Sequence, residues 1–191
     1  MSISPSEKVL VSIEDGIASV TINNPAANTW DLESLPALEA VVHELNGMAN
    51  VRALIITGQG EKFFSAGADL NQFASGDPVA AGAMGDAFGA AFETLADYRG
   101  VSIAAINGYA MGGGLEVALA CDIRIAESHA ALALPEARVG LLPCAGGTQR
   151  LAQLVGEGWA KRMILCGERV TAEKAMTLGL VEEGVESDRK S

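Results

Sequence analysis

Residues 107–122, with the sequence NGYAMGGGLEVALACD, are the stretch from which the rest of the fold can be predicted. Three consecutive glycines separate a strand-like apolar run, 101–106, from a helix-like run, 115–121. Glycine has no Cβ, so a ligand can approach the backbone closely at this turn. A helix that begins just beyond the turn directs free N–H groups and a partial positive charge back toward it. We therefore expect the turn to suit a negative charge, including one that develops only in a transition state.

Glu116 falls in the first turn of the expected helix. An acidic side chain at this position interacts favourably with the helix dipole, and such acids are common. This stretch alone therefore leaves two interpretations of Glu116 open, a structural acid and a catalytic acid beside the glycine turn.

The composition indicates a packed α/β protein rather than a disordered chain. The chain has 191 residues, of which 49% are hydrophobic and 19% charged, and 22 are glycines. This length suits one substantial domain, so we interpret residues 1–191 as a single domain. The formal net charge of −11 argues against nucleic acid and anionic membranes as partners, but does not exclude a small anionic ligand.

The cysteines and the N-terminus favour a cytoplasmic protein. Cys121, Cys144 and Cys166 are odd in number, widely spaced and without a CxxC pair, which is typical of reduced thiols and predicts no metal site. The N-terminus has no apolar segment typical of a signal peptide. No apolar run is long enough to span a bilayer.

Strand-like and helix-like segments alternate along the chain, which predicts a layered α/β domain. Asp15-Gly16 between two β-rich runs, 9–13 and 17–22, is a strong hairpin signal. Small residues in 63–70 suggest the opening of a helix there. The remaining expected strands are 51–57, 101–106, 122–126, 130–134 and 180–185, and the remaining expected helices are 32–45, 76–100, 149 onward, 158–165 and 171–179.

Common catalytic and nucleotide motifs are absent from the sequence. It contains no G-x-G-x-x-G that opens a helix and no P-loop, so dinucleotide binding and nucleotide hydrolysis are unsupported. Ser65 is not preceded by the glycine of a G-x-S-x-G elbow, which argues against a serine hydrolase.

Four sequence blocks, taken together, resemble the crotonase family, the enoyl-CoA hydratase/isomerase superfamily. Any one block is a weak signal, but their order and spacing match the family over most of the chain. The blocks are residues 64–70 (FSAGADL), 107–116 (NGYAMGGGLE), 121–126 with 134–136 (CDIRIA and LPE), and 142–151 (LPCAGGTQRL).

The resemblance implies a crotonase-like spiral of ββα units that assembles as a homo-oligomer, a trimer or a hexamer. The implied substrate is an acyl-CoA thioester, with no cofactor besides the coenzyme A that it carries. The amides of Ala68 and Gly113 match the family's oxyanion hole. Ala66, Asp69 and Leu70 match the loop that lies along the coenzyme A moiety.

The two glutamates that flank the reacting double bond in the family's hydratases match Glu116 and Glu136. Adding water to a 2-enoyl thioester builds negative charge on the carbonyl oxygen, which two amides can stabilise. The alkene needs a base to activate water at C3 and an acid to deliver a proton at C2. By the resemblance, we expect Glu116 to activate water and Glu136 to deliver the proton. An enoyl-CoA isomerase and a non-catalytic acyl-CoA-binding or assembly protein remain the alternatives.

The sequence departs from the family pattern in two places. Cys144 stands where relatives often have a glycine whose amide helps to hold the catalytic water, so we expect its amide to serve and its thiol to narrow the pocket. The chain also stops at Ser191, whereas relatives continue with a C-terminal helical segment. Without that segment we expect exposed apolar surface and association by other means.

Overall fold

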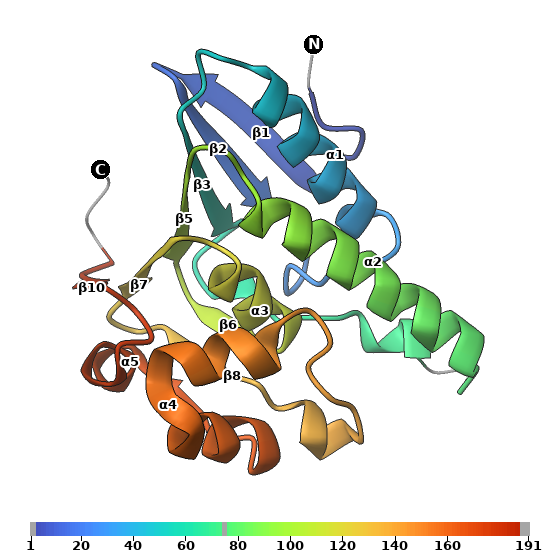
Figure 1. Ribbon diagram of the computed structural model, residues 1–191, viewed down its shortest axis with the longest axis vertical. Coiled ribbons are helices and arrows are strands. Elements are labelled where there is room, and N and C mark those ends of the chain that lie inside the picture. Colours follow the sequence, from blue (N-terminus) through green and yellow to red (C-terminus); the bar gives the residue numbers. More distant parts are fainter. Residues whose placement is uncertain (1–2, 74–75, 188–191) are drawn as a thin grey trace.

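The computed structural model describes residues 3–73 and 76–187, and two β-sheets form its frame (Figure 1). The larger sheet has the strand order β1-β2-β3-β5-β7-β10. Only β1 and β2 are antiparallel; every other neighbouring pair is parallel. Its strands are β1 (Val9–Glu14), β2 (Ile17–Ile22), β3 (Ala53–Gly58), β5 (Val101–Ile106), β7 (Ile123–Glu127) and β10 (Glu183–Val185).

The hairpin predicted at the start of the chain is confirmed. Glu14 pairs with Ile17, so a two-residue turn joins β1 to β2. Asp15 and Gly16 both have positive φ, 50° and 80°, as a primed hairpin turn requires. The strand expected at 51–57 is present as β3, which alternates between buried and half-buried residues, so only one of its faces is fully covered.

The smaller sheet lies beside the larger one and has the order β4-β6-β8-β9. The expectation of a helix opening in 63–70 is wrong. This segment starts with a strand because it pairs in parallel with a short strand inside the glycine stretch, which the sequence did not reveal. The four strands are β4 (Phe63–Ser65), β6 (Tyr109–Met111), β8 (Ala131–Ala133) and β9 (Val170–Thr171).

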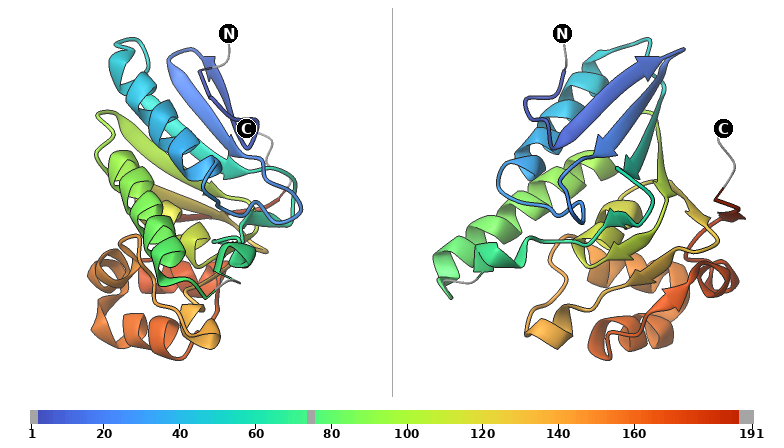
Figure 2. Two further views of the ribbon diagram at one scale, coloured as in Figure 1. Left: turned by 90° about the vertical axis from the view of Figure 1, so that its right-hand side faces the viewer. Right: turned by 180° about the vertical axis from the view of Figure 1, so that it is seen from behind.

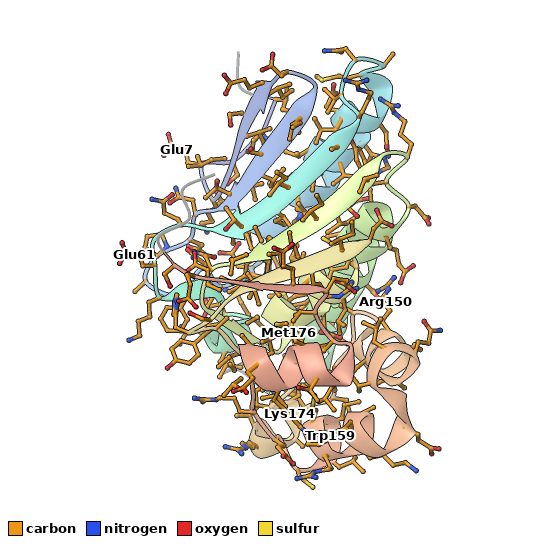
Figure 3. The ribbon with its side chains drawn as sticks, turned by 90° about the vertical axis from the view of Figure 1, so that its left-hand side faces the viewer. Glu7, Glu61, Arg150, Trp159, Lys174 and Met176 are labelled. Atoms are coloured by element: carbon orange, nitrogen blue, oxygen red, sulfur yellow. The ribbon has the colours of Figure 1, made fainter. Side chains whose placement is uncertain are left out.

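Two long helices, α1 (Ser34–Gly47) and α2 (Pro78–Ala96), cover one face of the larger sheet (Figure 2, left). Figure 3 looks onto the other face, with these helices behind the strands. The ring of Trp30 meets that of Phe92 edge-on at 5.7 Å, and Phe92 meets Phe88 in the same way at 5.4 Å. These three rings extend the hydrophobic core from the sheet to the face of α2 that packs against it.

The later helices stack below the sheets: α3 (Gly113–Leu119), α4 (Gly147–Leu165) and α5 (Ala172–Leu178), with the 3₁₀ turns η1 (Leu70–Phe73) and η2 (Glu136–Val139). Gly156, with φ 76° and ψ 162°, breaks α4 into the two helical segments that the sequence suggested. Lys174 of α5 and Arg162 of α4 stack on the Trp159 ring, at 4.6 and 4.3 Å from its centroid, and so join the two helices (Figure 3).

The ends of α5 follow their sequence signals. The Thr171 hydroxyl accepts a hydrogen bond from the Lys174 N–H, and Gly179 ends the helix with φ of 73°. In the part of the chain that the structure describes, no helix combines the length and the apolar character needed to cross a membrane.

Candidate active site

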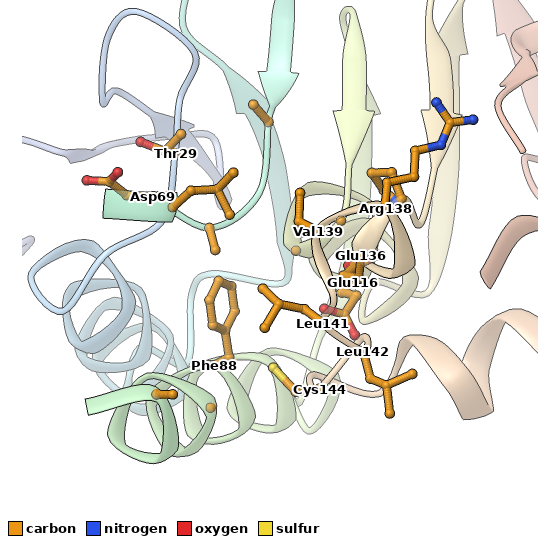
Figure 4. Close-up of a pocket in the computed structure, with 18 of the residues that line it drawn as sticks. Thr29, Asp69, Phe88, Glu116, Glu136, Arg138, Val139, Leu141, Leu142 and Cys144 are labelled. Atoms are coloured by element: carbon orange, nitrogen blue, oxygen red, sulfur yellow. The ribbon is translucent and has the colours of Figure 1, made fainter. Parts of the chain in front are cut away.

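A cavity of about 620 Å³ opens between α2, α3, the 66–71 segment and the loop that follows η2 (Figure 4). Its lining is mostly apolar, with a few convergent polar groups, which is the usual character of a small-molecule site. The structure brings every site residue predicted from the sequence to this one cavity: Ala66, Ala68, Asp69, Leu70, Gly113, Glu116, Glu136 and Cys144.

Two loops that line the cavity, 66–69 and 111–113, pack backbone against backbone. Gly67 has φ of 89°, and a Cβ on it would lie 2.6 Å from the Met111 carbonyl oxygen and 3.0 Å from the Gly113 nitrogen. No side chain fits in so short a space, so glycine is required at this position. The close packing brings the backbone amides of both loops to the same part of the cavity.

The N–H groups of Ala68 and Gly113 are not used in holding these loops together. Ala68 forms an isolated parallel bridge with Trp30, in which the Trp30 N–H donates to Gly67 and the Trp30 carbonyl accepts from Asp69, both at 2.8 Å. The residue between two such bonds directs its own N–H to the opposite side. Gly113 is the first residue of α3, where an N–H has no partner within the helix. Both donors are therefore available to an acceptor in the cavity.

Glu116 is only 2% exposed, and its carboxylate is held by the loop at the start of α4. Its Oε1 accepts hydrogen bonds from the N–H groups of Ala145 at 2.8 Å and Gly147 at 2.9 Å. Burial raises the pKa of Glu116, whereas these two N–H groups and the charge of Arg150 act to lower it. Glu116 therefore does more than interact with the helix dipole, because its carboxylate also anchors the loop at the start of α4.

Glu136 lies at the start of η2 in a contrasting environment. Its two carboxyl oxygens are buried and have no hydrogen-bond partner among the described residues. Burial, with the negative charge of Glu116, raises the pKa of Glu136 to about 7. The space that it occupies depends on Gly112, which has φ of 55° and on which a Cβ would lie 2.9 Å from the Glu136 Oε1. Glu136 is thus poised to give or take a proton near neutral pH.

Cys144 lines the cavity close to both carboxyl groups. Burial, and then the charges of Glu116 and Glu136, raise the pKa of the Cys144 thiol to about 11, so the thiol is neutral at physiological pH. Its backbone N–H is a further donor that favours the ionised form of Glu116. That this amide holds a water molecule stays a prediction.

The sequence reasoning missed the contribution of α2. Ala81, Gly85 and Phe88 line the cavity from one face of this helix. The Phe88 ring lies so close to the α3 start that a Cβ on Gly113 would be 2.6 Å from it. The signal that could have revealed this face is the helical spacing of two small residues and one aromatic, at positions i, i+4 and i+7.

The loop after η2 supplies the rest of the apolar wall through Val139, Leu141 and Leu142 (Figure 4). The exposed fractions of Val139 and Leu142 are 55% and 68%, so this wall faces solvent on its outer side. The Arg138 guanidinium turns away from the carboxyl groups and donates to the Gly167 carbonyl at 2.9 Å. Glu116, Glu136 and the Cys144 thiol are therefore the ionisable groups at the centre of a mostly apolar site. Among the described residues no three His, Cys, Asp or Glu side chains cluster as metal ligands would.

An apolar cavity that holds two carboxyl groups with different environments, beside two backbone amides, is suited to acid–base chemistry. Residues 12–189 match the sequence profile described as "Enoyl-CoA hydratase/isomerase". The chain therefore belongs to the enoyl-CoA hydratase/isomerase family, and its α/β architecture is the crotonase-like fold.

Curated and solved relatives agree with this assignment. The chain is 40% identical over 179 residues to a protein of Clostridium acetobutylicum named "Short-chain-enoyl-CoA hydratase". This match covers 93% of this chain and 69% of that protein. The structure of Pseudomonas aeruginosa DspI is similar at 64% identity and a TM-score of 0.94, covering 96% of this chain and 75% of that one. An enoyl-CoA hydratase of Bacillus anthracis is similar at 38% identity and a TM-score of 0.91, covering 95% of this chain and 71% of that one.

Proposed function

We propose that this protein is an enoyl-CoA hydratase, a hydro-lyase that adds water syn across the double bond of a trans-2-enoyl-CoA to give a 3-hydroxyacyl-CoA. The observation that carries the proposal is the difference between its two carboxyl groups. Burial raises the pKa of both carboxyl groups, but Glu116 also has two N–H donors that favour its ionised form, whereas Glu136 has a pKa of about 7 and no hydrogen-bond partner among the described residues. Hydration needs such a base and such an acid in one cavity.

In the proposed reaction, the thioester carbonyl oxygen accepts hydrogen bonds from the Ala68 and Gly113 N–H groups. Glu116 takes a proton from the water whose oxygen bonds to C3, and the electron pair of the double bond moves toward the carbonyl as an enolate. Glu136 then delivers its proton to C2, and the carbonyl re-forms. Exchange with solvent returns both carboxyl groups to their starting states. Each amide contributes roughly 3 kcal/mol to lowering the barrier if it behaves like a typical oxyanion-hole donor.

The cavity also suggests how the substrate lies. Phe88, Leu141 and Leu142 offer an apolar wall for the acyl chain, and Ala66, Asp69 and Leu70 line the opposite part, where coenzyme A would run. The carboxyl groups and amides provide every group that the reaction requires, so we propose that no cofactor takes part.

The test is the loss of conjugated absorbance when the protein is given crotonyl-CoA, with mass detection of 3-hydroxybutyryl-CoA. Turnover of a 3-enoyl-CoA to its 2-enoyl isomer, without hydration, would instead support an isomerase. An isomerase needs one group that both removes and returns a proton, and the pKa of Glu136, about 7, suits that role. Calorimetric binding of acyl-CoA without either turnover would support a non-catalytic binding protein.

We further propose that the protein acts in the cytoplasm as a homo-oligomer. Cys121, Cys144 and Cys166 are all free thiols, as in proteins of a reducing compartment. Exposed apolar residues on the edge strand β1 and on the loop after η2, such as Ile13 and Leu142, support association between copies. Sedimentation at micromolar concentration measures the oligomeric state.

A further inference from the structure

Arg150 lies outside the cavity, yet it contacts the loop that holds Glu116. It is in the first turn of α4, with 20% of its side chain exposed. Its Nη1 donates to the Ala145 carbonyl at 3.1 Å, and its Nη2 donates to Glu93 Oε1 of α2 at 2.9 Å. The guanidinium therefore bridges α2 to the loop at the start of α4.

The loop is shaped to admit this guanidinium. Gly146 has φ of 89°, and a Cβ on it would lie 2.0 Å from Arg150 Nη1. The Ala145 carbonyl that Arg150 binds belongs to the same residue whose N–H donates to Glu116 Oε1 at 2.8 Å. A displacement of the carbonyl would turn that peptide segment and move the donor away from the carboxylate.

We propose that Arg150, tethered by Glu93, is a positioning residue for the hydration reaction: it fixes residues 145–147 so that their amides hold the Glu116 carboxylate, and it places a positive charge behind that carboxylate. The inference rests on the proposed function. Arg150 does not touch the cavity, so it acts only through Glu116.

The charges around Glu116 give the direction of the effect. Burial raises the pKa of Glu116, the charge of Arg150 lowers it, and Glu116 raises the pKa values of its acidic neighbours Glu136 and Cys144. Without Arg150 the base would ionise at a higher pH. The acidic limb of the pH–rate profile would therefore move upward.

The ion pair is a poor candidate for a purely stabilising role. The Glu93 side chain is 64% exposed, and pairs of this kind contribute little to folding stability. A loss of rate without a matching loss of stability would therefore separate positioning from folding.

The experiment compares R150Q, R150K and E93Q with R162Q as the matched control. Arg162 lies on the same helix and pairs with the Glu168 carboxylate at 2.6 Å, and neither residue lines the cavity. For R150Q we expect kcat on crotonyl-CoA to fall at least tenfold, with KM within twofold and the acidic limb moved to higher pH. R150K should return the acidic limb of the pH–rate profile to its wild-type position but recover only part of kcat. E93Q should lower kcat by a smaller factor than R150Q does, and R162Q should match wild type.

A folded R150Q with kcat within twofold of wild type and an unmoved acidic limb would overturn the proposal. If R150Q does not fold, wild-type kinetics in E93Q would overturn it instead. A ¹³C NMR titration of the Glu116 carboxyl group in wild type and R150Q needs no turnover. A higher pKa of Glu116 in R150Q than in wild type would support the electrostatic part of the proposal, whether or not the wild type hydrates an enoyl-CoA. Failure of the wild type to hydrate any enoyl-CoA would count against the proposed function alone.

Discussion

Glu116 and Glu136 line the same cavity, but the chain holds them in different ways. A loop closes over Glu116 and gives its carboxylate two backbone donors, whereas Glu136 reaches the cavity from a short 3₁₀ turn without a partner among the described residues. The same chemical group thus lies in two different environments, one with backbone donors and one without. The comparison teaches that backbone donors, and not the type of side chain, distinguish the two carboxyl groups.

The largest expected effect is on the anchored carboxyl group. We expect Glu116→Gln to lower kcat on crotonyl-CoA by about 10³-fold, because general-base catalysis is lost. The amide oxygen of Gln can still accept from Ala145 and Gly147, so acyl-CoA affinity measured by calorimetry should be unchanged. Glu173→Gln, on the exposed side of α5, serves as the control. Full activity in the Glu116 variant would remove our assignment of the base.

The second prediction concerns the unpartnered carboxyl group. We expect Glu136→Gln to lower kcat by about 10²-fold, since general acids contribute on this scale. In the wild type, the rate should fall as the pH rises through about 7, because Glu136 loses the proton that it must deliver. The residual activity of the variant should lack this limb. A basic limb that persists in Glu136→Gln would show that another group supplies the proton.

A third prediction acts on Glu136 through the backbone. Gly112→Ala would place a Cβ 2.9 Å from the Glu136 Oε1 at a residue with positive φ, so both the carboxyl group and the loop must move. We expect kcat to fall roughly tenfold and stability to fall by about 1–3 kcal/mol. Gly158→Ala on α4 is the matched control, because a Cβ there meets nothing within 4 Å. Equal activity and Tm in the two variants would contradict the account of Gly112.

The smallest expected effect is on stability. Folding raises the pKa of Glu136 to about 7, so its contribution to stability is complete at low pH and is lost as the pH rises through 7. Glu136→Gln removes this dependence. We expect the free energy of unfolding of this variant, relative to that of wild type, to increase by on the order of 1–3 kcal/mol from about pH 5 to about pH 8. Urea unfolding of both proteins at each pH measures this difference. A constant difference across this range would mean that Glu136 is not buried as described.

The sequence predicted the parts of the fold that local chemistry specifies. The Asp15-Gly16 turn and the helix expected at 171–179 each followed from the backbone conformations that their residue types favour. The strand at 109–111 was not predicted, because three residues carry no periodic pattern and depend on pairing with β4 and β8. The segment 63–70 was predicted wrongly for the same reason.

For the site, sequence motifs named the residues on the loops but not those on the helix opposite. Residues 66, 68–70, 113, 116, 136 and 144 stand in recognisable blocks, and they all line the cavity. Phe88 and Arg150 were not identified, because an aromatic on an amphipathic helix and an arginine in a first turn have ordinary structural explanations. Only their positions relative to Gly113 and Ala145 give them significance.

The backbone contact at Gly67 has a consequence for how such a protein can diversify. The two amides that face the cavity belong to the main chain, so replacing the side chain of residue 68 leaves a donor in place. Inherited changes can therefore remodel the wall formed by Phe88, Leu141 and Leu142 and alter which acyl groups are accepted. The two main-chain donors would pass unchanged from one variant to the next as long as residue 67 stays glycine.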